Sequence, residues 1–540
     1  LTRAFVRSTR EPDANHSMIN NGSGLKGTRS VSVRARRSKQ SGQRSGQRRK
    51  VRRGRWRVGR ADVSLTPSAG IAAVAEVDRV LGLTATLDRH LPVLKQRDRG
   101  LTGGQTLTAI ASCQLAGGDH LVALDRRRAD AAGQELEPVP TPASTTAAGL
   151  ARRFTAEAFT GIEAAITAVN ARALGLVGQV RRTAVSRRVT LDIDATDVEV
   201  YGRAKTGSAY NYQGQRTYRA DIVLWAELGI PVAADLLAGD DDPRSSVVAL
   251  IRRTHANVLS SLSGRPAATG AAVTKVALRM DAGYFAADAA IAAHDLDIEF
   301  AIGVKRNPAV WRAATSVPDH AYVPVIGMND TGIETGSRTE VAVIPYAPKG
   351  WPAGITCLAR RTRIPADQIS RDPRARKRRT IPKDQLALAL DGKVDHAYGY
   401  SFILTNRPVH TPDHPDCAVD PEALAETEYW YRHRTDIEAL NKDAKHGAAL
   451  RHMPSGDTTV NQVWMWAALL ACAISAWIQE LTGIDRGNGR GRRTITRLRH
   501  ELINIPARVT HPGRTTVLRL PPGPNLLQTV LPRLQSLPAG

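Results

Sequence analysis

The spacing of apolar residues changes along the chain and predicts two kinds of structure in succession. From about residue 65 to about residue 178, apolar side chains recur at helical spacing, and Gly-rich breaks such as LTGGQT and LAGGDH separate the segments. From residue 188, RVTLDIDATDVEVYG alternates as a strand does, with Val189, Leu191 and Ile193 on one face. We therefore predict an all-helical region followed by a domain that begins with a strand.

The segments after this first strand alternate between strand and helix patterns. RADIVLWAELGIPVAADLLAG predicts two strands, TKVALRMDAGYF and DIEFAIGVK predict one each, and AADAAIAAHDL predicts a helix. Residues 306–398 are rich in Pro, Gly, Arg and Val and contain short strand patterns such as TEVAVIPY, but no helix of length. YGYSFILTN predicts a further strand, before a single long helix over EALAETEYWYRHRTDIEALNKDAKHGAAL. The fold class is therefore α/β, with a β-rich insertion in its core.

The longest apolar run, VWMWAALLACAISAWI, is shorter than the roughly 20 residues that a membrane span needs. Its Ala, Ser and Cys content suits close packing, so we expect a buried core helix. The beginning of the sequence lacks the apolar segment of a signal peptide. Neither feature favours a membrane location.

The charge of the chain favours a polyanionic partner. The formal net charge is +24, which is typical of proteins that bind nucleic acid or an anionic membrane surface. Since the apolar pattern speaks against a membrane, DNA or RNA is the better expectation. Four cysteines are scattered without any CxxC pair, which fits a reduced, cytoplasmic compartment.

Two N-terminal regions are candidates for contact with nucleic acid. Residues 1–60 include SGQRSGQRRKVRRGRWR, which contains no acid, and we expect them to be disordered. They are either a basic arm on DNA phosphates or an extension without function. The helical region contains an Ala-rich helix that ends in Arg152 and Arg153, and it either binds DNA or is an ordinary packing domain. We predict these regions: basic arm (1–60), helical DNA-binding region (61–185), first part of the core (186–305), β-rich insertion (306–398), second part of the core (399–482) and C-terminal tail (483–540).

Three acids lie at positions that a fold can bring together: one within or at the end of a predicted strand, one at the end of another strand, and one on the late helix. They are Asp194, Asp281 and Glu438. Such a set suits Mg²⁺, a hard cation that prefers oxygen and often takes only one or two protein carboxylates. Two such ions roughly 3.5–4 Å apart would activate a nucleophile and stabilise the leaving oxygen at a phosphorus. Asp192 is a rival for Asp194, because both lie on the same strand face.

Two other groups of possible metal ligands are weaker candidates. GDDDP, with Asp240 to Asp242, lies among turn residues, and we expect a solvated loop there. HTPDHPDC offers His410, His414 and Cys417 but no obvious fourth ligand for zinc, and we expect a plain loop.

The late helix carries a spaced set of four residue types. YRHRTDIEALNKDAK reads Tyr431-x2-Arg434-x3-Glu438-x6-Lys445, and on one helix these side chains would share one face. The spacing resembles the signature of bacterial cut-and-paste insertion-sequence transposases, the DDE enzymes with a Tyr-Arg-Glu-Lys motif. DIDATD resembles the Asp-x-Thr strand of that family, with Asp194 and Thr196, and RMDAGYF resembles its second motif. The resemblance covers residue 61 to the C-terminus.

The resemblance implies a ribonuclease-H-like catalytic core in which Asp194, Asp281 and Glu438 hold two Mg²⁺ ions, with Mn²⁺ as a substitute. It implies that Tyr431, Arg434 and Lys445 contact DNA phosphates. Arginine can grip a phosphate bidentately and lysine offers a point charge, so the residue types suit that role. The implied partners are terminal inverted repeats and target DNA, bound by a homodimer at the nucleoid of a bacterial cytoplasm. An inactive or domesticated DNA-binding protein and a structure-selective nuclease are the alternatives.

Overall fold

The computed structural model describes residues 56–97, 99–262, 275–327, 338–410, 418–484 and 492–540. The chain divides into two units, 1–60 and 61–540, and the second is described below. The predicted basic arm lies outside the described residues up to residue 55. The HTPDHPDC segment also lies outside them, apart from His410.

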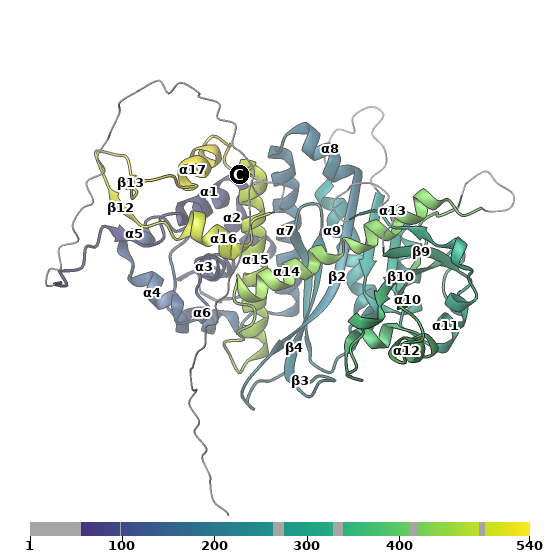
Figure 1. Ribbon diagram of the computed structural model, residues 1–540. Coiled ribbons are helices and arrows are strands. Elements are labelled where there is room, and N and C mark those ends of the chain that lie inside the picture. The colour runs from purple at the N-terminus through teal and green to yellow at the C-terminus, as the bar shows by residue number, and fades with distance from the viewer. Residues whose placement is uncertain (1–55, 98, 263–274, 328–337, 411–417, 485–491) are drawn as a thin grey trace, which may run out of the picture. The chain divides into compact units, whose positions relative to one another are not determined.

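A mixed sheet forms the centre of the second unit (Figure 1). Its strand order is β3-β4-β2-β6-β7-β11-β10-β9-β8, and β5 pairs with β4. Strands β2, β6 and β7 are parallel, whereas β4 is antiparallel to both β2 and β5. This mixed order is consistent with the expected ribonuclease-H-like core. The strands are β2 (Arg188–Glu199), β3 (Ala209–Tyr210), β4 (Arg216–Trp225), β5 (Ile230–Ala238), β6 (Lys275–Met280), β7 (Glu299–Gly303), β8 (Val323–Pro324), β9 (Thr339–Ile344), β10 (Thr356–Pro365) and β11 (His396–Thr405).

Helices from both halves of the sequence pack against the sheet. Helix α14 contacts β2 and β4, while α9 and α15 contact β5. The expected core helix is α15, which Asp457 caps and which ends at Gly483 in the left-handed conformation. Among the described helices it alone is long and apolar enough to cross a membrane, and 94% of its apolar window is buried in the protein interior. The helices are α7 (Ala156–Leu176), α8 (Gln179–Arg187), α9 (Val247–Leu262), α10 (Ala287–Asp295), α13 (Pro421–Arg432), α14 (Thr435–His446) and α15 (Thr458–Thr482).

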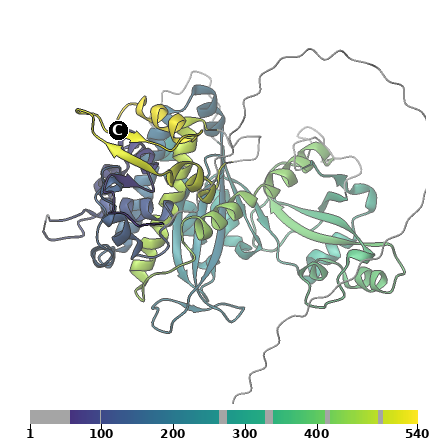
Figure 2. The ribbon, with the colours of Figure 1, turned by 60° about the vertical axis from the view of Figure 1, so that its left-hand side comes forward.

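The N-terminal helices pack against α15 and α7 and also against the C-terminal segment (Figure 2). β1 pairs with β12, and α1 contacts α17, so the described part of the C-terminal segment, residues 492–540, packs on the beginning of the unit. A capping box of Thr102 and Gln105 starts α3. The elements are β1 (Leu65–Thr66), α1 (Ile71–Leu81), α2 (Leu83–His90), α3 (Gly103–Leu115), α4 (Ala123–Ala129), α5 (Ala131–Gln134), α6 (Ser144–Ala151), α16 (Ile495–Leu498), β12 (Ala507–Thr510), β13 (Val517–Arg519) and α17 (Leu527–Gln535).

The insertion contains helices that the sequence pattern did not predict. α11 (Pro308–Thr315) and α12 (Lys383–Leu390) accompany strands β8 to β10, and Figure 1 shows them gathered on one side of the sheet. Asn307 caps α11 and Pro308 occupies its first turn, which are strong start signals. Each helix has eight residues, about two turns, so its periodicity is too short to stand out among the prolines.

The predicted single long helix is broken in two. α13 ends at Arg432 and α14 begins at Thr435, with His433 and Arg434 between them. The backbone tightens there, because the amide of Arg434 donates to the carbonyl oxygen of Tyr431 and that of Ile437 donates to the carbonyl oxygen of Arg434. The expectation that the four motif residues share one helix face is therefore wrong: Tyr431 lies on α13, while Glu438 and Lys445 lie on α14.

Candidate active site

Two predicted acids lie at the same edge of the sheet, because their strands are parallel neighbours. Ile193 on β2 pairs with Met280 on β6, and the next residues along the chain are Asp194 and Asp281. Asp194 lies within β2, which continues to Glu199, whereas Asp281 directly follows β6. The Asp281 carboxylate accepts a hydrogen bond of 2.7 Å from the amide of Gly283, which fixes the turn that follows the strand.

The Asp194 carboxylate is held by two side chains from the motif segment. Arg434 places a guanidinium nitrogen 3.3 Å from Oδ1, and Asn441 donates from its amide nitrogen to Oδ2 at 2.8 Å. Arg434 also donates to Glu438, one helical turn later, at 3.1 Å. One guanidinium therefore bridges two acids that are far apart in the sequence, and the Asp194 side chain is 18% exposed while that of Glu438 is 58% exposed.

The electrostatics show that all three acids share this environment. Burial raises the pKa of Asp194 to about 6, Arg434 opposes that rise, and the charges of Asp281 and Glu438 add to it. Burial disfavours the charge of Arg434, but Tyr431 and the three acids raise its pKa overall. The structure thus brings Asp194 and Glu438 onto one guanidinium, while Asp281, at the end of the neighbouring strand, adds its charge to the same environment.

The donor chemistry of this place fits a divalent cation, although the present arrangement holds a guanidinium. Among the described residues, no group of three His, Cys, Asp or Glu side chains is arranged to hold one ion. Two of the three carboxylates, those of Asp194 and Glu438, nevertheless contact Arg434, and Asp281 follows the neighbouring strand; hard cations such as Mg²⁺ prefer such oxygen ligands. A metal would have to take over the charge compensation that Arg434 provides here.

Asp192, the rival of Asp194, has a different partner. Its two carboxylate oxygens accept hydrogen bonds of 2.5 and 2.7 Å from Arg279, which lies opposite it on β6. Both side chains are almost fully buried, and Arg279 also donates to the carbonyl oxygen of Trp430. This carboxylate is therefore engaged inside the core and does not face Asp281 or Glu438.

Tyr431 and Lys445 make backbone contacts in this structure. The Tyr431 hydroxyl donates to the carbonyl oxygen of Met280 at 3.1 Å, directly before Asp281. Lys445 donates to the carbonyl oxygen of Asp197 at 2.7 Å and lines a cavity of about 470 Å³ together with Lys205. Burial lowers the pKa of Lys445, and the nearby acids oppose that shift. Both side chains therefore contact the backbone of the strands that lead to the acids, Tyr431 that of β6 and Lys445 that of β2.

Sequence reasoning missed two features of the site. Asn441 contacts Asp194, and its buried amide oxygen has no hydrogen-bond partner among the described residues. Asp221, on β4, accepts a hydrogen bond from Tyr284, in the turn after Asp281. Burial raises the pKa of Asp221 to about 7, against the effect of that hydrogen bond. Asn441 lies three residues after Glu438, a helical spacing that could have indicated that the two side chains are neighbours. No feature of the sequence indicated Asp221.

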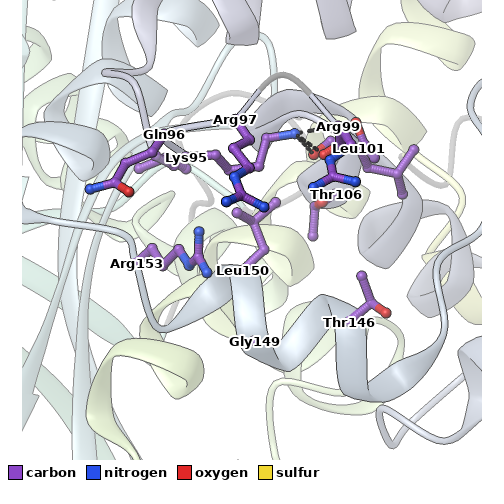
Figure 3. Close-up of a pocket in the computed structure, with 12 residues that line it drawn as sticks. Lys95, Gln96, Arg97, Arg99, Leu101, Thr106, Thr146, Gly149, Leu150 and Arg153 are labelled. Carbon is purple, nitrogen blue, oxygen red and sulfur yellow. Dashed lines mark hydrogen bonds between the residues drawn. The ribbon is translucent and has the colours of Figure 1, made fainter.

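A basic cavity lies away from these acids, in the helical region (Figure 3). Its volume is about 860 Å³, and Arg97, Arg99 and Arg153 surround it. Lys95 turns inward and donates to three successive backbone carbonyl oxygens, those of residues 99–101, so it fixes the loop. Among the described lining residues there is no acid, which leaves three exposed guanidinium groups at one cavity.

Comparisons with known proteins identify the family. The chain matches the model of the transposase DDE domain, group 1, over residues 51–371 and 376–539. A search of curated proteins finds no match. Among solved structures, it is similar to piggyBac transposase in a synaptic complex with hairpin DNA, with a TM-score of 0.35 and 9% identity over 81% of this chain and 79% of that chain. A likeness that distant adds nothing to the family match, which covers most of the sequence. The chain therefore belongs to the transposase DDE domain family, group 1, and is a transposase enzyme.

Proposed function

We propose that this transposase cuts DNA at the ends of its element and joins the freed 3′-hydroxyls to target DNA. We assign it to the bacterial cut-and-paste insertion-sequence branch with the Tyr-Arg-Glu-Lys motif. The observation that carries the proposal is that Arg434 bridges Asp194 and Glu438 while Asp281 follows the parallel strand next to that of Asp194. Three carboxylates seldom gather on a partly exposed edge of a sheet without a functional reason, because like charges repel one another.

In this proposal the three acids hold Mg²⁺, which Mn²⁺ can replace. Bound there, divalent cations would activate a water or 3′-hydroxyl and stabilise the leaving oxygen. Arg434 would then turn from the carboxylates to a DNA phosphate, where it can donate bidentately. Lys445 and Tyr431 would contact neighbouring phosphates, and Asn441 would keep the Asp194 carboxylate oriented.

We further propose that the helical region, 61–185, binds the terminal inverted repeat. The three arginines around its cavity support this role, since guanidinium groups suit phosphate oxygens. Pairing two ends requires two active sites, so we infer a homodimer on DNA. Its site of action is the nucleoid in a bacterial cytoplasm.

A single substitution tests the reaction. Glu438→Gln keeps the size and the hydrogen-bonding capacity of the side chain but removes one anionic ligand. We expect it to bind end DNA as the parent does, while cleavage and strand transfer in Mg²⁺ fall at least about 100-fold, as for loss of a group that stabilises charge in the transition state. Cleavage at the parental rate would show that the third acid is wrongly assigned.

The alternative function is DNA binding without catalysis, as in a domesticated transposase. The presence of all three acids and of the motif cations favours the active enzyme. Short inverted repeats flanking the gene would support mobility, and their absence at every genomic copy would favour domestication. Purified protein incubated with end DNA and Mg²⁺ separates the two functions directly, because only the active enzyme produces nicked ends.

A further inference from the structure

An exposed turn of the insertion carries a dense group of cations. Within residues 371–383 there are seven arginines and lysines and one acid, Asp372. We call this segment the basic turn. Six of the seven cationic residues are exposed, and Arg378 is half-buried. Among the described residues, none of the seven side chains forms an ion pair with a carboxylate. The cations are Arg371, Arg374, Arg376, Lys377, Arg378, Arg379 and Lys383.

Hydrogen bonds to the backbone hold the basic turn together, although its like charges repel one another. Arg378 donates to the carbonyl oxygen of Arg371 at 2.6 Å, and Asp372 accepts from the amide of Arg374 at 2.9 Å. Asp372, the only acid within residues 371–383, therefore binds a backbone amide and forms no ion pair with the cations of the turn. Burial and the nearby charge of Arg376 lower the pKa of Arg306, which shows that the positive charges act on one another. A fold that keeps like charges together in this way favours a polyanionic ligand.

The basic turn is connected to the edge of the sheet that carries the acids through the segment that follows β7. Arg306, three residues after the end of β7, donates to the carbonyl oxygen of Arg379 at 2.9 Å. The end of β7 packs closely on the Asp281 turn, because a Cβ atom on Gly303 would lie 2.8 Å from the amide nitrogen of Ala282 and 2.9 Å from the Tyr431 hydroxyl. The ring of Phe285, just after the Asp281 turn, packs at a tilt of 32° against that of Trp351 in the insertion, with centroids 5.0 Å apart.

The cations also surround a hollow that a nucleic-acid backbone can enter. A cavity of about 600 Å³ lies between α11, the basic turn and the beginning of α12. Four cations line it, Arg312, Arg378, Arg379 and Lys383, together with one acid, Asp384, and the half-buried Trp311.

We propose that the basic turn binds the phosphate backbone of duplex DNA, independently of sequence, where the duplex approaches the Asp194–Asp281–Glu438 edge. This inference rests on the proposed function, because it assumes that DNA is the substrate at that edge. Backbone contacts position a duplex without reading its bases. The basic turn would thus hold the duplex beside the scissile phosphate for both element ends and target DNA.

The test compares two charge-matched double variants of the full chain. Arg376→Gln with Lys377→Gln removes two cations from the basic turn, and Arg338→Gln with Lys349→Gln removes two exposed cations elsewhere in the insertion. DNA affinity is measured against salt concentration without divalent cations, for end duplex and for an unrelated duplex of equal length. For the turn variant we expect the slope of log K against log[salt] to become less steep by about 2 with both duplexes, and the affinity at 0.1 M salt to fall roughly tenfold or more. The control variant should keep the parental slope.

Further outcomes decide the proposal. Arg376→Lys with Lys377→Arg should retain the parental slope, because it keeps the charges. An unchanged slope in the Gln turn variant, an equal change in the control, or an effect with end duplex alone would overturn the proposal. So would displacement of DNA from the parent by inorganic phosphate at constant ionic strength, since it would indicate a single-anion site. These measurements need no cleavage, so they are independent of the Glu438→Gln result that tests the proposed function.

Discussion

At the scale of single residues, two aspartates on one strand face differ completely in environment. Asp192 is buried and receives both hydrogen bonds from Arg279, whereas Asp194 is partly exposed and faces Arg434 and Asn441. Alternation in a strand gives them the same face, but only the neighbouring strands and helices decide which one meets the other acids. The same residue type therefore serves the core at one position and the proposed site at the other.

This difference predicts opposite effects of the same substitution. Asp192→Asn leaves the buried Arg279 with only the more distant, half-exposed Asp436, 4.0 Å away, as a counter-charge, and should lower the free energy of unfolding by about 3–5 kcal/mol. Asp194→Asn should cost much less stability, because its surroundings are partly solvated, but should abolish Mg²⁺-dependent cleavage. Denaturant unfolding and cleavage per mole of folded protein, measured on both variants, check this. Full cleavage by Asp194→Asn would move the role to Asp192.

At the scale of elements, α15 joins the sheet core to the N-terminal helices through its tryptophans. Trp466 and Trp477 are both fully buried. The indole of Trp477 donates to the side-chain oxygen of Asn170 on α7 at 2.9 Å, whereas the indole nitrogen of Trp466 has no acceptor among the described residues. Comparing the two positions therefore separates the contribution of burial to the free energy of unfolding from that of a buried hydrogen bond.

The pair allows a matched measurement of that hydrogen bond. Trp→Phe removes similar apolar volume at both positions, but at Trp477 it also leaves the oxygen of Asn170 unpaired. We expect Trp477→Phe to destabilise the protein by about 1–3 kcal/mol more than Trp466→Phe does. The midpoint of urea unfolding at constant m-value measures the difference. Equal midpoints would mean that the Asn170 contact contributes nothing to stability.

The success of sequence reasoning also differed between elements. Strands β2, β4 to β7 and β11 and the core helix α15 were predicted because alternation and long apolar runs follow directly from burial. The break between α13 and α14 was not, since it depends on local backbone bonds around His433 and Arg434. Asn441 and Asp221 were missed because their roles arise from contacts over long sequence distances. Motif resemblance could single out Asp194, Asp281 and Glu438, but that Asp194 and Asp281 end up on neighbouring strands is a property of the sheet order.

At the scale of the whole molecule, buried carboxyl groups link elements across the unit. Glu163 on α7 accepts from Arg253 on α9 at 3.1 Å and from the amide of Ala234 on β5 at 3.3 Å. Arg253 in turn pairs with Asp235 at 2.8 Å. Burial raises the pKa of Glu163 from 4.5 to about 7, although Arg253 and the amide oppose the rise. Folding of the unit is therefore coupled to the protonation of Glu163.

The sign of this coupling predicts how stability depends on pH. Between pH 4.5 and 7 the folded state keeps the Glu163 proton while the unfolded state releases it, so the contribution of this group to stability falls as pH rises. The unfolding free energy of the parent, relative to Glu163→Gln, should therefore decrease by about 2–3 kcal/mol from pH 5 to pH 8. Chemical unfolding at several pH values measures it, with Glu157→Gln, an exposed site on the same helix, as the control. A relative free energy that stays constant or rises with pH would show that the ion pair with Arg253 outweighs burial.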